Sequence, residues 1–230
     1  MKKSRKILLV SASFMVLALA FALFIFQSSI IPRLPFSAPE TSYHSWEEIF
    51  ASPKVITIQT YSTGTMQTDL SGIMNLAHEK AADIEDVVVE VPVNVSIIQH
   101  QDFGAWLIDA GLDASYVNNP YGTTRGLFVN KLGKGSQAPN THSAAILEQE
   151  NIQLQGVWLT HLHPDHTAGI VDLPKNIPYV AGKGEHYINF RFFMQADHLK
   201  GIEALYEIDF TAGIDLPPFG KGVDLLGDGS

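Results

Sequence analysis

Four side chains that can bind a metal ion fall within six positions of this sequence: His161, His163, Asp165 and His166. They lie in residues 160–169, directly after an apolar run. Imidazole and carboxylate groups together suit borderline or hard divalent ions, which accept nitrogen and oxygen ligands in one site. The alternative is a solvated polar turn with an incidental histidine cluster, although histidines that need only a hydrogen-bond partner are usually isolated. The run therefore predicts a metal site.

A fifth candidate is Asp109, which follows a short apolar run, residues 105–108, and precedes Ala110 and Gly111. A polar, glycine-containing connection separates this run from the valine-rich residues 87–98, so the two runs predict a β-hairpin. Asp109 leaves the strand where a glycine permits a tight turn, and it could face a site. A purely turn-forming aspartate is the equally weighted alternative.

The elements that must position these side chains follow from the hydrophobic pattern. The pattern predicts strands at residues 55–61, 87–98, 105–108, 156–160 and 178–180. It predicts helices from a cap at Ser143 to about Glu150, from Thr167 onward, and over residues 185–194, with a short helix or loop at 70–76. Residues 112–140 form a long loop of the kind often used as a lid or binding loop. Helix, strand and active loop in that order indicate an α/β layered fold.

The composition limits what the chain can do. With 230 residues, 46% of them hydrophobic, it is long enough for one sizeable domain and a short appendage. It has no cysteine, so any metal must be held by His, Asp or Glu. The net charge of -9 argues against nucleic acid as a partner.

The amino terminus predicts a membrane anchor. Residues 7–26 carry no charge and only Ser11 and Ser13 as polar interruptions, and as a helix they would span ~30 Å, the hydrocarbon thickness of a bilayer. A cleaved secretory signal and a buried soluble helix are the alternatives, but a signal has an apolar region of ~7–15 residues and an Ala-x-Ala-like site. We therefore expect a basic cytoplasmic region at 1–6 and a transmembrane signal anchor at 7–27 in contact with the lipid bilayer.

That topology places the rest of the chain on the extracytoplasmic side, periplasmic or extracellular, or makes it a secreted protein if the signal is cleaved. Residues 28–53 contain Pro32, Pro35, Pro39 and Pro53, a composition that suits a linker. The globular domain is expected at 54–230.

His161-Leu162-His163-Pro164-Asp165-His166 at a strand end, with Asp109-Ala110-Gly111 closing an earlier hairpin, closely resembles the metallo-β-lactamase-fold hydrolases. The resemblance covers about residues 54–230, and the hairpin at 93–111 looks most like the acyl-homoserine-lactone lactonase branch. It implies an α/β fold, the αβ/βα metallo-β-lactamase sandwich, here incomplete and preceded by the transmembrane helix.

The resemblance also implies roles and a cofactor. His161 and His163 match ligands of a first Zn²⁺, and Asp165 and His166 match ligands of a second, with Fe or Mn as alternatives. Two bound ions would lower the pKa of a bridging water from ~15.7 towards ~7 and polarise a carbonyl. Asp109 matches the residue that orients a ligand histidine, and Asp165 is the candidate catalytic residue that moves a proton to the leaving group.

The sequence departs from the family pattern downstream. The family supplies further ligands there, but only His186 and His198 follow His166, and both are expected to have ordinary core or surface roles. Residues 223–230 look like a strand turn in mid-domain, so the chain reads as an amino-terminal portion of a longer enzyme.

These observations predict a metal-dependent hydrolase of a lactone, an ester or a β-lactam, with its site incomplete in this chain. The alternatives are a glyoxalase-type thioesterase or an iron-dependent sulfur dioxygenase of the same fold, or an inactive metal-binding membrane protein. A small-molecule substrate is implied, but loops rather than the metal motif determine which one. The sequence leaves the substrate-binding residues and the oligomeric state unknown.

Overall fold

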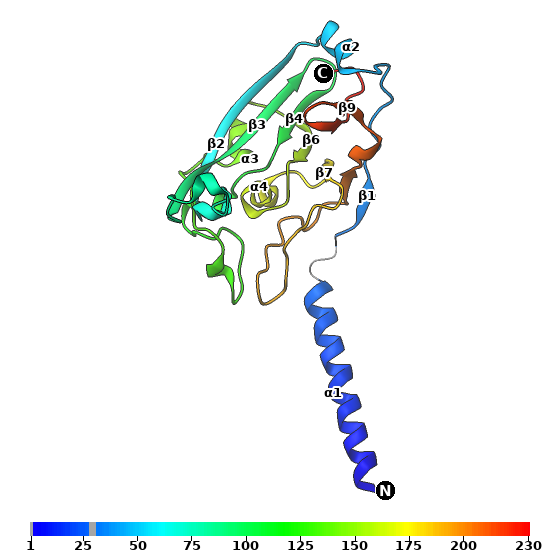
Figure 1. Ribbon diagram of the computed structural model, residues 1–230, viewed down its shortest axis with the longest axis vertical. Helices are drawn as coiled ribbons and strands as arrows, with labels where there is room; N and C mark the ends of the chain where they lie inside the picture. Colours follow the sequence, from blue (N-terminus) through cyan, green and yellow to red (C-terminus); the bar gives the residue numbers. More distant parts are fainter. Residues whose placement is uncertain (1, 28–30) are drawn as a thin grey trace.

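A mixed sheet forms the centre of the molecule in the computed structural model, which describes residues 2–27 and 31–230 (Figure 1). Within the first helix, side chains are described for residues 10–25. The helices are α1 (Lys2–Gln27), α2 (Trp46–Ala51), α3 (Ser143–Gln149) and α4 (Pro164–Thr167), the last continued by a 3₁₀ turn at Ala168–Asp172. The strands are β1 (Arg33–Pro35), β2 (Ile56–Asp69), β3 (Val88–His100), β4 (Gly104–Ile108), β5 (Gly135–Ser136), β6 (Leu154–Leu159), β7 (Tyr179–Gly182), β8 (Leu205–Ile208), β9 (Ile214–Leu216) and β10 (Gly220–Gly222).

The main sheet has the strand order β1-β8-β7-β6-β4-β3-β2-β5. Strands β4, β6, β7, β8 and β1 pair in parallel, whereas β2, β3 and β4 form an antiparallel meander. The hairpin between β3 and β4 is the one that the sequence predicts, and the strands predicted near 55–61, 156–160 and 178–180 are confirmed as β2, β6 and β7. Because parallel strands end at the same edge of a sheet, β4, β6, β7 and β8 bring their following loops together.

One face of this sheet carries the hydrophobic core. Alternate residues along the strands point to it, among them Leu107, Val157 and Tyr179, each at most 1% exposed. Helix α3 and the turn after α4 cover this face with Leu147 and Ile170. Each such side chain contributes about 1.5–3 kcal/mol on burial, so the strand ends that hold the candidate site are supported by tight packing beneath them.

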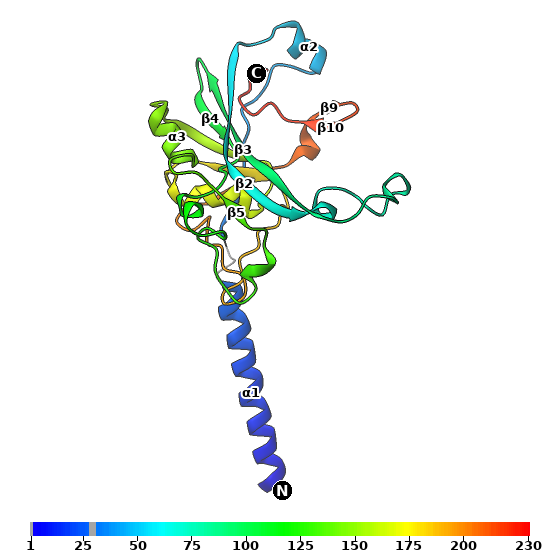
Figure 2. The same ribbon diagram turned by 90° about the vertical axis from the view of Figure 1, so that its left-hand side faces the viewer.

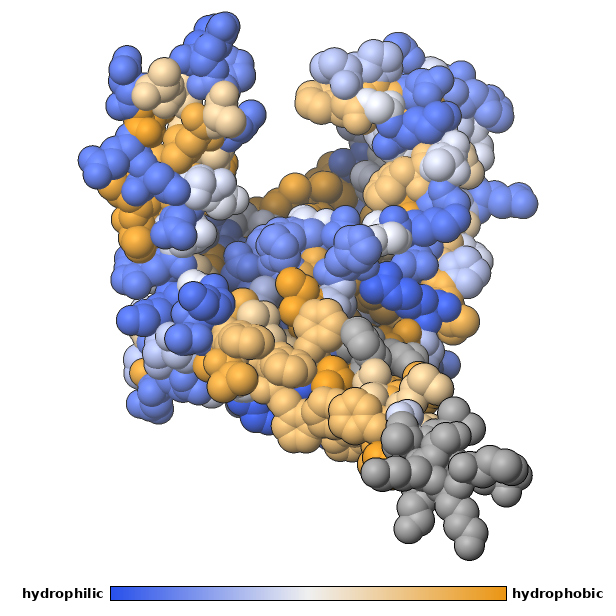
Figure 3. Space-filling model, turned by 60° about the horizontal axis from the view of Figure 1, so that its bottom comes forward, coloured by the Kyte–Doolittle hydropathy of each residue, from blue (hydrophilic) through white to orange (hydrophobic). Residues whose placement is uncertain are grey.

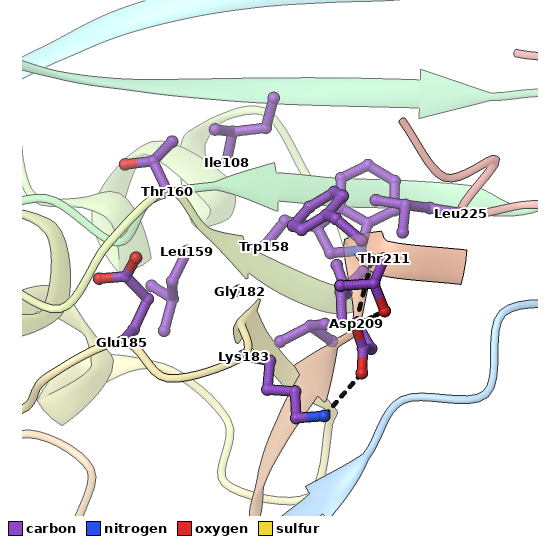
Figure 4. A pocket seen from close by; sticks show the side chains of 13 residues that line it. Ile108, Trp158, Leu159, Thr160, Gly182, Lys183, Glu185, Asp209, Thr211 and Leu225 are labelled. Carbon is purple, nitrogen blue, oxygen red and sulfur yellow. Dashed lines mark hydrogen bonds and ion pairs between the residues drawn. The ribbon is translucent and has the colours of Figure 1, made fainter. Parts of the chain in front are cut away.

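The opposite face of the sheet carries a cavity of about 880 Å³. Ile108, Trp158 and Val180 line it (Figure 4), and the indole of Trp158 stacks on that of Trp106 with ring centroids 4.7 Å apart. In Figure 4 the ammonium group of Lys183 points toward Asp209, and the two form an ion pair at 2.6 Å. The space-filling view shows a surface hollowed between two raised parts (Figure 3).

The predicted membrane anchor is not borne out. Among the residues that the structure describes, no helix is both long enough and apolar enough to cross a membrane. The transmembrane signal anchor at 7–27 is therefore wrong, and so are the lipid contact, the single-pass topology and the extracytoplasmic placement derived from it.

The carboxyl-terminal part of α1 contacts the globular part of the chain. The rings of Phe21 and Phe24 lie 6.3 Å and 5.8 Å from the ring of Phe192, and the guanidinium of Arg191 lies 4.1 Å above the Phe24 ring. Figure 2 shows the rest of the helix projecting away from the sheet. Aromatic and cation–π contacts thus fix where this helix meets the domain.

The proline-rich segment predicted as a linker contains structure. Its residues 28–30 lie outside the described residues, but β1 pairs in parallel with β8, with Leu34 opposite Tyr206. The guanidinium of Arg33 donates a hydrogen bond to Glu207 at 2.6 Å, and α2 follows with Ser45 as its amino-terminal cap. Residues 33–35 are therefore an edge strand of the sheet, a position where proline is tolerated because its nitrogen need not donate.

Two local predictions differ from the structure. Residues 185–194 form no helix, because their backbone pairs with a distant loop: Leu127 N donates to Phe192 O at 2.8 Å, and Phe192 adopts a φ of 70°. Ser143 does not cap α3; His142 holds the cap position, and the Ser143 hydroxyl donates to the carbonyl oxygen of Ala110 at 2.6 Å. In both places a tertiary hydrogen bond outweighs the local preference.

Gly169 allows the turn after α4 to approach the end of β4, and this contact is testable. Its amide donates to the carbonyl oxygen of Gly111 at 2.8 Å, and an added Cβ would overlap the backbone carbonyl of Ala110. We expect Gly169→Ala to lower the free energy of unfolding by about 1–3 kcal/mol. Gly182→Ala is the matched control, because its Cβ would meet nothing closer than 3.7 Å. Urea denaturation of both variants measures the difference, and equal stabilities would contradict the close approach.

Candidate metal centre

The candidate residues meet at the carboxyl ends of two paired strands. Ile108, the last residue of β4, lies opposite Trp158 in β6, and the amide of Asp109 donates to the carbonyl oxygen of Trp158 at 2.8 Å. The parallel register therefore carries Asp109 to the start of the loop that contains the histidine motif, residues 161–166. Asp109 and Thr160 are 51 positions apart in the sequence, and the parallel pairing of β4 with β6 brings them into contact.

Asp109 is buried, with 5% of its surface exposed, and both oxygens of its carboxylate have a polar partner. Oδ1 accepts the amide of Thr160 at 2.8 Å, and Oδ2 lies 2.8 Å from Nδ1 of His166. Its φ of 60° is in the left-handed region, which aspartate and asparagine tolerate better than most residues. The backbone conformation thus aims the carboxylate back at the histidine motif.

The three imidazoles of the motif form a cluster. The ring centroid of His161 lies 4.5 Å from that of His163 and 3.9 Å from that of His166. Nε2 of His166 faces Oδ2 of Asp165 at 3.3 Å. His166 consequently lies between two carboxylates, those of Asp109 and Asp165, with one on each ring nitrogen.

A helix start and a backbone hydrogen bond fix the backbone of the motif. His163 is the cap residue of α4 and Pro164 its first residue, where a fixed φ suits the start of a helix. The amide of Ala110 donates to the carbonyl oxygen of His166 at 2.8 Å. This hydrogen bond and the Gly169 contact tie the carboxyl-terminal end of α4 and the turn after it to the residues that follow β4.

The charges in the cluster shift its proton equilibria. Burial lowers the pKa of His161, and the neighbouring imidazoles of His166 and His163 lower it further. For His166 the effect of burial is outweighed by hydrogen bonds to Asp109 and Asp165, which raise its pKa to about 9. Burial opposes ionisation of Asp165, but its hydrogen bond to His166 and the charge there hold its pKa below the usual value. At neutral pH the structure thus favours an uncharged His161 and a charged pair of Asp165 and His166.

The donor set fits a divalent ion in its chemistry, although it is not closed around one position. Among the described residues, no three His, Asp or Glu side chains converge closely enough to hold a metal ion as they stand. The ring centroids of His163 and His166 nevertheless lie 4.5 Å and 3.9 Å from that of His161, and an uncharged His161 is in the form that binds metals. Side-chain rotation within the cluster would be needed to bring the donors onto one ion.

The residues outside the motif fall into two groups. His198 is completely buried and lies in the interior, where Tyr187 accepts its amide at 2.7 Å, and no ring contact links it to the three motif imidazoles. Thr160 and Thr167, which sequence reasoning did not single out, both touch the cluster. Thr160 lies between Asp109 and His161, and Thr167 donates to the carbonyl oxygen of His163 at 3.0 Å. The position of Thr160 directly after β6 is the one sequence feature that could have identified it.

Comparison with known proteins agrees with this architecture. Residues 88–225 match the metallo-beta-lactamase superfamily, and the chain belongs to that superfamily. It contains the sheet and the helical layer of the fold described above, with the histidine motif at the carboxyl end of β6.

Two solved structures with the same fold illustrate the relationship. One is a B. thuringiensis AiiA mutant with N-decanoyl-L-homoserine bound at its active site, and the other is an N-acyl homoserine lactone hydrolase with the product N-hexanoyl-L-homoserine bound at its catalytic metal center. Each has a TM-score of 0.52 and 20% sequence identity, over 68% of this chain and 60% of the other. This chain therefore spans about 60% of the length of these structures. A search of the curated proteins found no match.

The ion pair of Asp109 and His166 predicts that the pKa of His166 is raised in the metal-free protein, and this pKa can be measured. Since the folded-state pKa of His166 is raised to about 9, the stabilisation by this pair is complete below its ordinary pKa of 6.5 and is lost as the pH rises through 9. Asp109→Asn keeps the left-handed backbone but removes the charge, so we expect the pKa of His166 to fall. An NMR titration of the imidazole in metal-free protein measures it.

The control for this titration is Asp102→Asn, at the opposite end of β4 and exposed to solvent. It removes the same charge without touching the cluster, so the His166 titration is expected to stay as in the wild type. A His166 pKa unchanged by Asp109→Asn would contradict the pairing.

Proposed function

We propose that this chain carries the metal-binding residues of a metal-dependent hydrolase that opens a lactone or ester. The observation that supports this most is the clustering of His161, His163, Asp165 and His166 after β6, with Asp109 beside them at the end of the neighbouring strand β4. The chain spans about 60% of the length of the solved structures it matches. That these 230 residues are active on their own is therefore also a proposal.

Each residue of the candidate site has a separate proposed role. His161, His163, Asp165 and His166 would hold zinc, with two ions in the complete site and iron or manganese as alternatives. When bound, the metal would activate a water molecule at neutral pH and polarise the carbonyl under attack. Asp109 pairs with Nδ1 of His166, so Nε2, which faces Asp165 in this structure, would be the nitrogen that binds a metal. Such an outer contact orients the ring and raises its basicity.

Asp165 is the residue proposed to move a proton. Its pKa is held below the usual value by the hydrogen bond and charge of His166, which outweigh burial, so it is a carboxylate at neutral pH and able to accept one. With 29% of its side chain exposed, it is also within reach of a substrate. We infer that its carboxylate takes the proton lost by the water that attacks the carbonyl carbon and passes it to the leaving oxygen when the ester C–O bond breaks.

The substrate class rests on the solved structures of the same fold. One has N-decanoyl-L-homoserine bound at its active site, and the other has the product N-hexanoyl-L-homoserine bound at its catalytic metal center. At 20% identity this likeness supports the fold, and it favours a lactone over a β-lactam as the first compound to test. The metal motif serves any carbonyl ester, so the loops around it select the substrate.

Metal removal and restoration test the proposal. We expect the chain to open an N-acyl homoserine lactone in a reaction that a chelator abolishes and added Zn²⁺ restores, with about two equivalents of metal bound. His161→Ala and His163→Ala are expected to lose more activity than the ~10–100-fold typical of outer contacts such as Asp109. His186→Ala is the control, because His186 lies outside the cluster and should leave the rate unchanged.

Other results would point elsewhere. Consumption of oxygen with an iron-loaded protein would indicate the sulfur dioxygenase alternative, and turnover of thioesters alone would indicate a thioesterase. A protein that binds one metal ion or none and opens no ester would overturn the proposed function.

A further inference from the structure

A further histidine, which lies outside the candidate metal cluster, is connected to it through hydroxyl groups. His198 is completely buried, and its ring lies between two buried threonines: Oγ1 of Thr124 is 3.2 Å from Nε2, and Oγ1 of Thr167 is 2.9 Å from Nδ1. Thr124 comes from the long loop and Thr167 from the end of α4. A single ring thus joins segments that are 74 and 31 residues away from it.

The direction of each hydrogen bond can be derived from the acceptors. Oγ1 of Thr167 also lies 3.0 Å from the carbonyl oxygen of His163, and a carbonyl oxygen can only accept. The one proton of the Thr167 hydroxyl is therefore donated to His163, so Nδ1 of His198 must supply the proton of its own contact with Thr167. Nε2 is then the unprotonated nitrogen, and the Thr124 hydroxyl donates to it.

The burial of His198 agrees with a ring that carries one proton. Burial lowers its pKa to about 4; Asp113 and Asp197 oppose this shift and Lys175 adds to it. The ring is accordingly uncharged at neutral pH, with one donor and one acceptor nitrogen. Its two nitrogens are matched to one accepting and one donating hydroxyl.

The loop and the histidine motif lie directly against one another at this point. A cavity between them, lined by Thr124, His163 and Pro164 among others, has a volume of only about 20 Å³. A space of that size is about enough for one water molecule and too small for an organic ligand. A displacement of Thr124 would therefore also displace the start of α4.

We propose that His198 is a positioning residue whose Nδ1–H tautomer completes a one-directional relay from Thr124 through Thr167 to the carbonyl of His163. The relay fixes the first turn of α4, which carries Asp165 and His166, and couples it to the loop at residues 112–140. His198 touches neither substrate nor metal. Its effect on metal binding rests on the proposed function, whereas the relay itself is a property of the metal-free protein.

Substitutions can separate the two ends of the relay. In His198→Asn the amide nitrogen takes the place of Nδ1 and keeps the bond to Thr167, whereas in His198→Gln the amide reaches the place of Nε2 and keeps only the bond to Thr124. His198→Phe fills the same space and makes neither bond. Thr167→Val removes the last donor, and Thr167→Ser retains it.

Two measurements test the proposal on the 230-residue chain. The first is the nitrogen-15 NMR spectrum of the imidazoles in metal-free wild-type protein, where we expect His198 to carry its proton on Nδ1. The second is titration with Zn²⁺, and with Co²⁺ to observe ligand geometry by absorption. We expect His198→Phe and Thr167→Val to weaken metal binding ~10–100-fold, as losses of outer contacts do, and His198→Asn and Thr167→Ser to recover most of it.

The control is Tyr179→Phe, which removes a buried hydrogen bond of 2.7 Å to the carbonyl oxygen of Pro174, away from the motif. It is expected to lower stability while leaving the Zn²⁺ affinity and the Co²⁺ spectrum unchanged. A merely structural role for His198 would make the His198 variants behave like Tyr179→Phe. If His198→Phe does not fold, the Thr167 pair answers the same question.

The outcomes separate this inference from the proposed function. A proton on Nε2 of His198 in the wild type overturns the relay, and so does unchanged metal binding in both His198→Phe and Thr167→Val. If the wild type binds no metal, the proposed function fails, and the tautomer of His198 then decides the relay alone.

Discussion

The parallel pairing of β4 with β6 is the interaction on which the candidate site depends. Because Ile108 lies opposite Trp158, the residues after both strands emerge together, and Asp109 reaches Thr160 and His166. The hydrogen bond from Ala110 to the His166 carbonyl then fixes the far end of the motif. A slip of register would move Asp109 away from the cluster, so the core packing that sets this register also determines the geometry of the site.

The charged groups of the cluster are paired with one another. A charged His166 without a partner would be costly in a partly buried place, and the carboxylates of Asp109 and Asp165 at its two ring nitrogens avoid this cost. Two further hydrogen-bonding layers support it: Thr160 beside Asp109, and Thr167 beneath the carbonyl of His163. The site is therefore best described as a network of hydrogen bonds on a rigid strand edge rather than as four side chains on a loop.

The two faces of the sheet have different roles. One face is closed by α3 and the turn after α4, with side chains that are almost completely buried, and it supplies the rigidity. The other face contains the large cavity with Trp158 and Ile108 in its lining. The metal motif lies at the strand ends, where the rigid layer meets the long loop, and His198 connects that loop to the motif from within the core.

The sequence by itself determined the superfamily, the strands β2, β3, β4, β6 and β7, and the composition of the histidine motif, because alternating hydrophobic residues and closely spaced histidines are local patterns. It also placed Asp109 at a strand end. The same local reasoning was wrong for residues 7–27 and 185–194, where a membrane span and a helix were expected. Only the tertiary structure decided the partner of Asp109, the strand at 33–35 and the Thr124–His198–Thr167 connection. These depend on strand register and on contacts across up to 174 positions of the chain, as between Arg33 and Glu207, and no local pattern encodes them.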